Sequence, residues 1–107
     1  MSARTLIDMP RRVRRGETFE IRAMIGHPME TGYRRGSDGD RLPRNILTEF
    51  GCVFDGELVF SAKLYPAISA NPFLSFSMKA DRSGELVFRW RGDSGFSHTE
   101  RVNLVVE

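Results

Sequence analysis

The stretch LVFRWRGDSGFSHTERVNLVV, residues 86–106, decides the fold class of this 107-residue chain. Every second residue from Leu86 to Trp90 is large and apolar. The GDSG that follows is a turn signal, and beyond it apolar side chains again occupy alternate positions up to Val106. Because alternation with a period of two is typical of a strand with one buried face, the stretch predicts two strands joined by a turn.

The same alternation continues towards the N-terminus. Asp55-Gly56 predicts a tight hairpin turn, and the segment after it is expected to turn Leu58, Phe60, Ala62 and Leu64 inward. Thr5–Asp8, followed by Met9-Pro10, is expected to be a short edge strand. The remaining expected strands are Glu17–Ile25, Phe50–Phe54, Leu58–Leu64 and Leu74–Met78.

About seven short strands separated by turn signals, with no sustained helical period, predict an all-β chain. In about 100 residues this pattern is typical of an immunoglobulin-like two-sheet β-sandwich. The length is that of a single domain, residues 1–107. Trp90 and most of the phenylalanines are then expected in the core.

Composition and charge narrow the classes of function only slightly. The sequence is 40% hydrophobic and 28% charged, which is typical of a globular protein. The net charge is +2, but residues 1–44 contain ten arginines and six acidic residues. This local excess permits an anionic partner without indicating nucleic acid. No apolar run approaches the ~18 residues of a membrane span.

Two segments interrupt the alternation and are candidate functional loops. His27–Ile46 is polar, has three glycines, and carries charges of both signs. Loops of this length in small domains are usually functional or disordered. Tyr65–Pro72 is apolar for a loop, so we expect either this domain or a partner protein to cover it.

The sequence offers few candidates for catalysis. Cys52 and His27 could form a thiol dyad if the thiol were accessible, but Cys52 lies in the apolar row of its strand and is expected to be buried. No Gly-x-Ser-x-Gly motif occurs. His27, Met29 and Met24 could suggest a soft metal site. The alternative is that Met29 packs inward and His27 forms local hydrogen bonds, so we expect no catalytic, cofactor or metal residues.

The densest basic run is Arg11–Arg15. It is interpreted either as a solvated turn leading into a strand or as a patch for an anion or nucleic acid. Most aromatic residues are expected to face inward, which disfavours base stacking. The residues alone therefore predict a non-enzymatic interaction module. The rival hypothesis is a small thiol-dependent redox or anion-binding β-sandwich that uses Cys52 and His27 or Arg11–Arg15.

Three motifs resemble a known family. They are IGHPMETG at 25–32, PRNI at 43–46 and AISANPFLSF at 67–76. In this order they resemble SoxZ, the smaller subunit of the SoxYZ sulfur carrier of bacterial thiosulfate oxidation, and the resemblance extends over nearly the whole chain. It implies a non-catalytic subunit. Its partner, SoxY, would carry sulfur intermediates on a cysteine in a flexible, glycine-rich C-terminal arm.

The residues fit the Z-type subunit, because the sequence ends VNLVVE and its one cysteine lies mid-strand. The resemblance implies a heterodimer with a SoxY-type protein and transient contact with other Sox enzymes through that complex. It implies neither nucleic-acid nor membrane binding, and the isolated chain could self-associate. The candidate partner-binding residues are His27, Met29, Glu30, Tyr33, Arg34, Arg35, Pro66, Ile68, Asn71 and Phe73, with Arg34 and Arg35 also suited to an anionic sulfur adduct.

The expected location differs between the two lines of reasoning. Met1–Asp8 contains no apolar signal-peptide core, which alone predicts a cytoplasmic chain. The resemblance implies instead a periplasmic protein that is exported together with its partner, because SoxY carries the export signal. We take the periplasm as the expectation.

Overall fold

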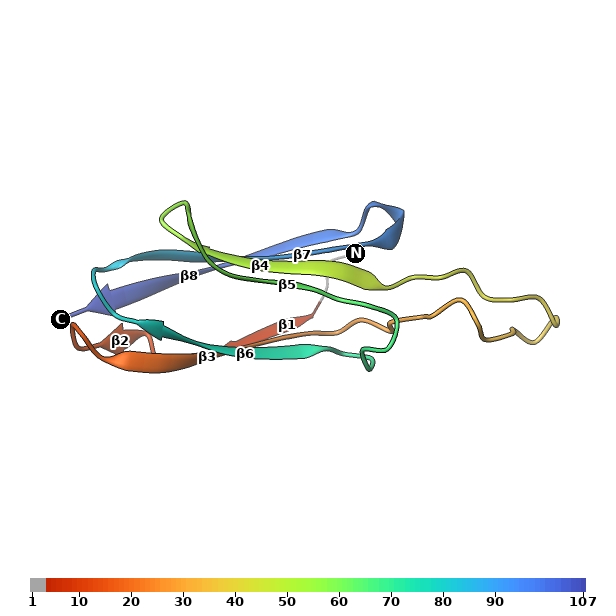
Figure 1. The fold of residues 1–107 in the computed structure, drawn as a ribbon, viewed down its shortest axis with the longest axis horizontal. Helices are drawn as coiled ribbons and strands as arrows, with labels where there is room; N and C mark the ends of the chain where they lie inside the picture. Colours follow the sequence, from red (N-terminus) through yellow and green to blue (C-terminus); the bar gives the residue numbers. More distant parts are fainter. Residues whose placement is uncertain (1–3) are drawn as a thin grey trace.

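The computed structural model describes residues 4–107 as two β-sheets packed face to face (Figure 1). The three-stranded sheet has the order β1 (Thr5–Asp8), β3 (Thr18–Ile25), β6 (Phe73–Lys79). The five-stranded sheet has the order β2 (Arg12–Val13), β8 (Ser97–Val106), β7 (Gly84–Gly92), β4 (Leu47–Phe54), β5 (Glu57–Lys63). A short 3₁₀ turn, η1 (Asp93–Gly95), joins β7 to β8. The predicted all-β, immunoglobulin-like sandwich is confirmed.

The core forms where the apolar rows of the two sheets meet. Phe50, Phe88 and Trp90 are completely or almost completely buried, and the rings of Phe50 and Trp90 lie 5.2 Å apart. Phe60 of one sheet stacks on Phe76 of the other, with ring centroids 4.5 Å apart and planes 4° from parallel. Stacked and tilted aromatic pairs of this kind add stability beyond the area that they bury.

The hairpin between β4 and β5 corrects one expectation. Asp55 and Gly56 both have positive φ, 48° and 86°, as the predicted tight turn requires. The register then shifts, because Cys52 pairs with Phe60 whereas Val53 pairs with Leu58. This bulge turns the half-buried Val59 towards the core. Leu58, expected to face inward, is instead 66% exposed.

The basic run Arg11–Arg15 is more than a solvated turn. Arg12–Val13 forms the two-residue strand β2, which pairs in parallel with the end of β8. Val13 is buried, while the neighbouring arginines are exposed. A two-residue strand is too short to show any alternation, so the sequence contained no signal for it.

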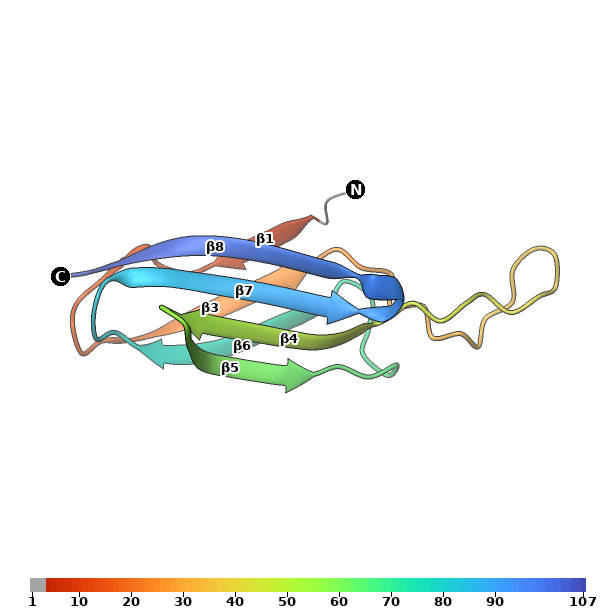
Figure 2. The same cartoon turned by 90° about the horizontal axis from the view of Figure 1, so that it is seen from above.

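The sandwich is elongated, and one end carries the long loop (Figure 1). Its principal extents are 58 × 20 × 19 Å. Seen from above, β8, β7, β4 and β5 run side by side, and the chain between β3 and β4 projects beyond them (Figure 2). No helix in residues 4–107 is long and apolar enough to cross a membrane.

Candidate partner-binding site

The two loops that interrupt the alternation meet at one end of the sandwich. The backbone N–H of His27 donates to Asn71 Oδ1 at 3.0 Å, and the backbone N–H of Asn71 donates to the carbonyl of His27 at 2.7 Å. Asn71 has a positive φ of 54°, a conformation that asparagine tolerates better than most residues. The structure thus brings together two candidate residues that are 44 positions apart in the sequence.

His27 and Met29 are buried and hold a local turn. The backbone N–H of Met29 donates to His27 Nδ1 at 3.0 Å, and Met29 Sδ accepts from the backbone N–H of Leu47 at 3.2 Å. The His27 ring packs edge-on against Phe96, with centroids 5.3 Å apart. Burial lowers the pKa of His27, and the carboxylate of Asp93 partly offsets this. The predicted local role of both side chains is confirmed.

The chain between β3 and β4 runs out and back as an irregular hairpin, residues 30–45, here called the arm. Glu30 and Asn45 bridge at its base with two backbone hydrogen bonds of 2.8 and 2.7 Å. Nearer the tip, Arg35 bridges to Arg41. The long loop therefore has backbone pairing of its own.

The charged candidates on the arm already have partners. Arg34 binds both carboxylate oxygens of Glu30, the closest contact being 2.6 Å, and this pairing lowers the pKa of Glu30. Arg35 donates to the carbonyl of Gly39 at 2.8 Å. Tyr33 is largely exposed beside them. The ion pair between Arg34 and Glu30 would have to break before all the guanidinium N–H groups of Arg34 could bind an anion.

Asp93 clamps the root of the arm and was not among the residues singled out from the sequence. Its carboxylate accepts two hydrogen bonds from Arg44, at 2.9 and 2.8 Å, and one from the backbone N–H of Ile46 at 3.0 Å. Its own N–H donates to the carbonyl of Ile46 at 2.9 Å. These hydrogen bonds lower the pKa of Asp93. Gly92 permits this close approach, because a Cβ there would lie 2.6 Å from the Ile46 carbonyl oxygen.

An apolar row crosses the outer face of the three-stranded sheet at the same end of the molecule. Leu6 pairs with Met24, which pairs with Phe73, and the three side chains are 58%, 40% and 53% exposed. The remainder of that face is polar, with Arg22 paired to Glu20. Phe73 was expected as a contact residue, whereas Leu6 and Met24 were not. The sequence feature that could have revealed Leu6 and Met24 is an apolar residue at a strand position that faces solvent.

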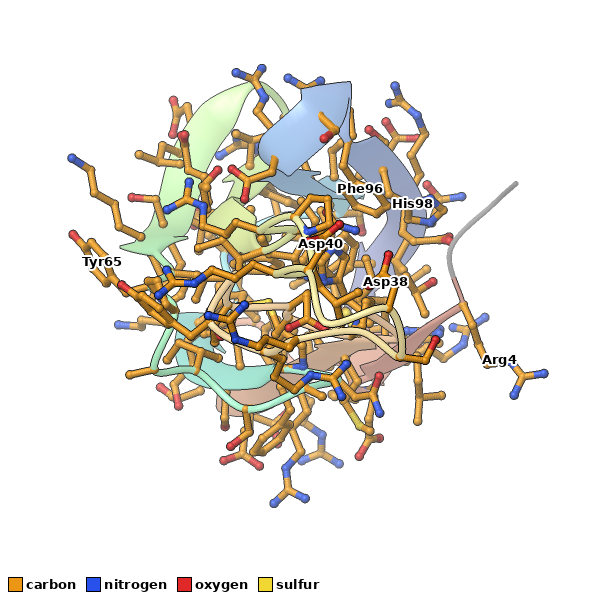
Figure 3. The ribbon with its side chains drawn as sticks, turned by 90° about the vertical axis from the view of Figure 1, so that its right-hand side faces the viewer. Arg4, Asp38, Asp40, Tyr65, Phe96 and His98 are labelled. Carbon is orange, nitrogen blue, oxygen red and sulfur yellow. The ribbon has the colours of Figure 1, made fainter. Side chains whose placement is uncertain are left out.

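The apolar loop leads directly into this row. Tyr65 and Ile68 are exposed, and Pro66 is half-buried. Figure 3, viewed onto this end, shows Tyr65 projecting from the side opposite Arg4. Beside the row, a pocket of about 450 Å³ is lined by Leu6, Met24, Gly26 and Asn71, among others. Of the ten candidates, Ile68, Asn71 and Phe73 therefore lie on or next to a surface suited to a protein partner.

The thiol of Cys52 lies elsewhere, in the middle of the core. Its residue is 0% exposed, and burial raises the pKa of the thiol to about 12. A thiol that stays protonated is a poor nucleophile and a poor metal ligand. Within residues 4–107 no three histidine, cysteine or acidic side chains cluster as metal ligands would.

Comparison with known proteins identifies a family. The model of a family described as Sulphur oxidation protein SoxZ matches residues 7–103 of this chain. No curated protein sequence matches the chain.

Several solved structures share the fold. A superoxide reductase (neelaredoxin) from Ignicoccus hospitalis is 18% identical with a TM-score of 0.74, over 98% of this chain and 82% of that protein. The sulfur carrier protein SoxY from Chlorobium limicola f thiosulfatophilum is 15% identical with a TM-score of 0.69, over 96% and 78% of the two chains. At these identities the likeness concerns the fold alone.

Proposed function

This chain belongs to the SoxZ family and therefore has a role in sulfur oxidation, and on that premise we propose that it is the non-catalytic subunit of a SoxYZ sulfur carrier. In this proposal a SoxY-type partner holds the sulfur intermediates of thiosulfate oxidation on its own cysteine. The present chain supports that partner as the second half of a heterodimer.

The observation that carries the proposal is the state of Cys52. A carrier of sulfur intermediates needs a thiol that reaches solvent and ionises readily. Cys52 is completely enclosed between the two sheets, and its pKa is about 12. The one cysteine of this sequence is therefore unsuited to carry cargo, which favours a supporting subunit.

We propose that the partner packs on the apolar row of Leu6, Met24 and Phe73 and on the loop that contains Ile68. Three neighbouring apolar side chains on an otherwise polar sheet face are a feature of interaction sites. A stable heterodimer needs on the order of 1,600 Å² of buried surface in total. The row would supply the apolar centre of such an interface, with Arg4 and Asp8 at its edge.

The test is co-expression with a tagged SoxY-type chain from the same genome. Phe73→Asp places a charge at the centre of the row, so we expect it to abolish co-purification of the two chains. Leu58→Asp is the matched control, because Leu58 is also exposed, at 66% against 53% for Phe73, but lies in the β4–β5 hairpin at the opposite end of the sandwich. Intact binding by Phe73→Asp, or equal loss in both variants, would place the interface elsewhere.

Labelling with iodoacetamide tests the non-catalytic role separately. In the native complex we expect label on the partner's cysteine alone, with Cys52 labelled only after denaturation. Rapid labelling of Cys52 in the folded chain would overturn the proposal and favour a thiol-dependent function of this chain.

We propose the periplasm as the place of action, reached together with the partner. The family resemblance supports this location. Cell fractionation tests it. The chain should be periplasmic when the SoxY-type partner carries its export signal and should remain in the cytoplasm when that signal is deleted.

A further inference from the structure

A pocket lies on the outer face of the five-stranded sheet, away from the apolar row. Its volume is about 210 Å³, and its walls come from the middle of β4 and β7. Gly51 lies opposite Arg89, with Glu49 opposite Arg91 and Val53 opposite Val87. Gly51 forms the floor, because a Cβ there would meet nothing within 4 Å. The hollow thus exists because one strand position lacks a side chain.

Arg89 and Arg91 stand on the same side of β7 at this pocket. Both are exposed, and two residues along a strand separates them by about 7 Å. Within residues 4–107 neither guanidinium forms a hydrogen bond or an ion pair, unlike Arg34, Arg44 and Arg101. Two guanidiniums without partners beside a small hollow leave a set of N–H donors available to a ligand.

The surrounding charges favour an anion. Arg89, Arg91 and one carboxylate, that of Glu49, line the pocket, and Lys63 lies next to it, opposite Glu49 on β5. Arg101, on β8 opposite Val87, is occupied by Glu85 at 3.0 Å. Glu49 is one residue pair away from the level of Gly51 and Arg89. An anion seated over Gly51 would therefore contact Arg89 first, and it would meet Arg91 at the same level as the Glu49 carboxylate.

We propose that this pocket, called here the Gly51 pocket, binds a small sulfur oxyanion such as thiosulfate, sulfate or a sulfonate group. Its volume is below the range of about 300–1,000 Å³ that is typical of sites for larger organic ligands. A planar guanidinium donates two parallel hydrogen bonds to an oxyanion, and two guanidiniums can donate to the same tetrahedral group. Val53 and Val87 bound the pocket at its apolar end.

The site rests on residues of this chain alone and does not require the proposed heterodimer. It is therefore tested on the full chain without a partner. Backbone amide shifts in NMR spectra are followed while sodium thiosulfate or sodium sulfate is added, with sodium chloride at equal ionic strength as the reference. We expect saturable shifts centred on Gly51 and Arg89 with the oxyanions and none with chloride.

Two charge-matched variants separate the site from general attraction. Arg89→Gln with Arg91→Gln should weaken thiosulfate binding about tenfold or more, because charge-assisted hydrogen bonds are lost. Arg11→Gln with Arg15→Gln removes the same charge from the basic run Arg11–Arg15. This variant should keep its thiosulfate affinity within about twofold of that of the native chain. Equal losses in both double variants, or no saturable shift in the native chain, would overturn the proposal.

A third variant tests the pocket itself. Gly51→Val fills the floor of the pocket with a side chain that suits a strand. We expect it to weaken thiosulfate binding several-fold while it leaves the melting temperature unchanged or raises it. Undiminished binding by a folded Gly51→Val chain would show that the pocket does not hold the anion.

Discussion

His27 lies at the end of β3, where it has a packing and hydrogen-bonding role. Its Nδ1 accepts the N–H of Met29, which has a positive φ of 50°, and its ring packs against Phe96. The ring thereby stabilises a backbone conformation that a methionine rarely adopts. This role requires the neutral ring, because a protonated Nδ1 cannot accept a hydrogen bond.

The stability of the fold should therefore fall as the pH drops through the His27 range. The pKa of His27 in the folded chain is below 6.5, its ordinary value. Below about pH 6.5 the unfolded chain gains a proton that the folded chain resists, so unfolding is favoured as acidity increases. Chemical denaturation between about pH 7 and 5 measures this loss.

The variant His27→Asn provides the control for that measurement. Its Oδ1 can accept the Met29 N–H but does not titrate, so the fall in stability above about pH 5 should be smaller than in the native chain. His27→Leu removes the acceptor and should be less stable than His27→Asn at every pH. An unchanged pH dependence in His27→Asn would contradict the assignment.

At the scale of elements, the arm is held at its root by a turn that follows a distant strand. Asp93, the first residue after β7, bridges Arg44 and Ile46 just before β4 begins. Its backbone N–H, which donates to the carbonyl of Ile46, continues the backbone pairing of β4 and β7 by one further step. The arm therefore depends on the β7–β8 connection for its direction.

Substitutions at Asp93 should loosen the arm in a graded way. Asp93→Ala removes both sets of hydrogen bonds and should accelerate hydrogen exchange of the Ile46 amide about tenfold or more. Asp93→Asn keeps an acceptor for that amide, and Arg44→Gln breaks only the ion pair, so both should have smaller effects. Native exchange rates in Asp93→Ala would show that the arm is fixed by other contacts.

At the scale of the whole molecule, the two ends of the sandwich differ in kind. One end has the tight hairpin turn at Asp55-Gly56, and the other has the arm, the apolar loop and the apolar row (Figure 1). The Gly51 pocket opens on the opposite sheet from the row. A partner on the row would thus leave the pocket open to solvent.

The isolated chain should self-associate through the same row that we assign to the partner. Burial of an exposed apolar surface is favourable with any apolar partner surface, including that of a second copy of the chain. We expect sedimentation velocity to show concentration-dependent oligomers, and Phe73→Asp to shift them to monomer while Leu58→Asp does not. Monomers at every concentration in the native chain would contradict this expectation.

The features of the fold and of the candidate site that the sequence predicted are those that depend on residues close together in the chain. The strands and the burial of Cys52 followed from period-two alternation, which is a local property. The bulge that exposes Leu58 did not, because register depends on the partner strand. The candidate set contained Asn71 and Phe73 through motif resemblance, but it lacked Leu6, Met24 and Asp93.

The sequence by itself determined the two-sheet β class, the core around Trp90 and membership of a sulfur-oxidation family. Only the tertiary structure decided which distant residues meet. His27 forms a hydrogen bond with Asn71, and Asp93 forms an ion pair with Arg44. Arg89 lies opposite Gly51 on the neighbouring strand. The physical reason is that alternation specifies which face of a strand is buried, whereas pairing between strands specifies which side chains become neighbours.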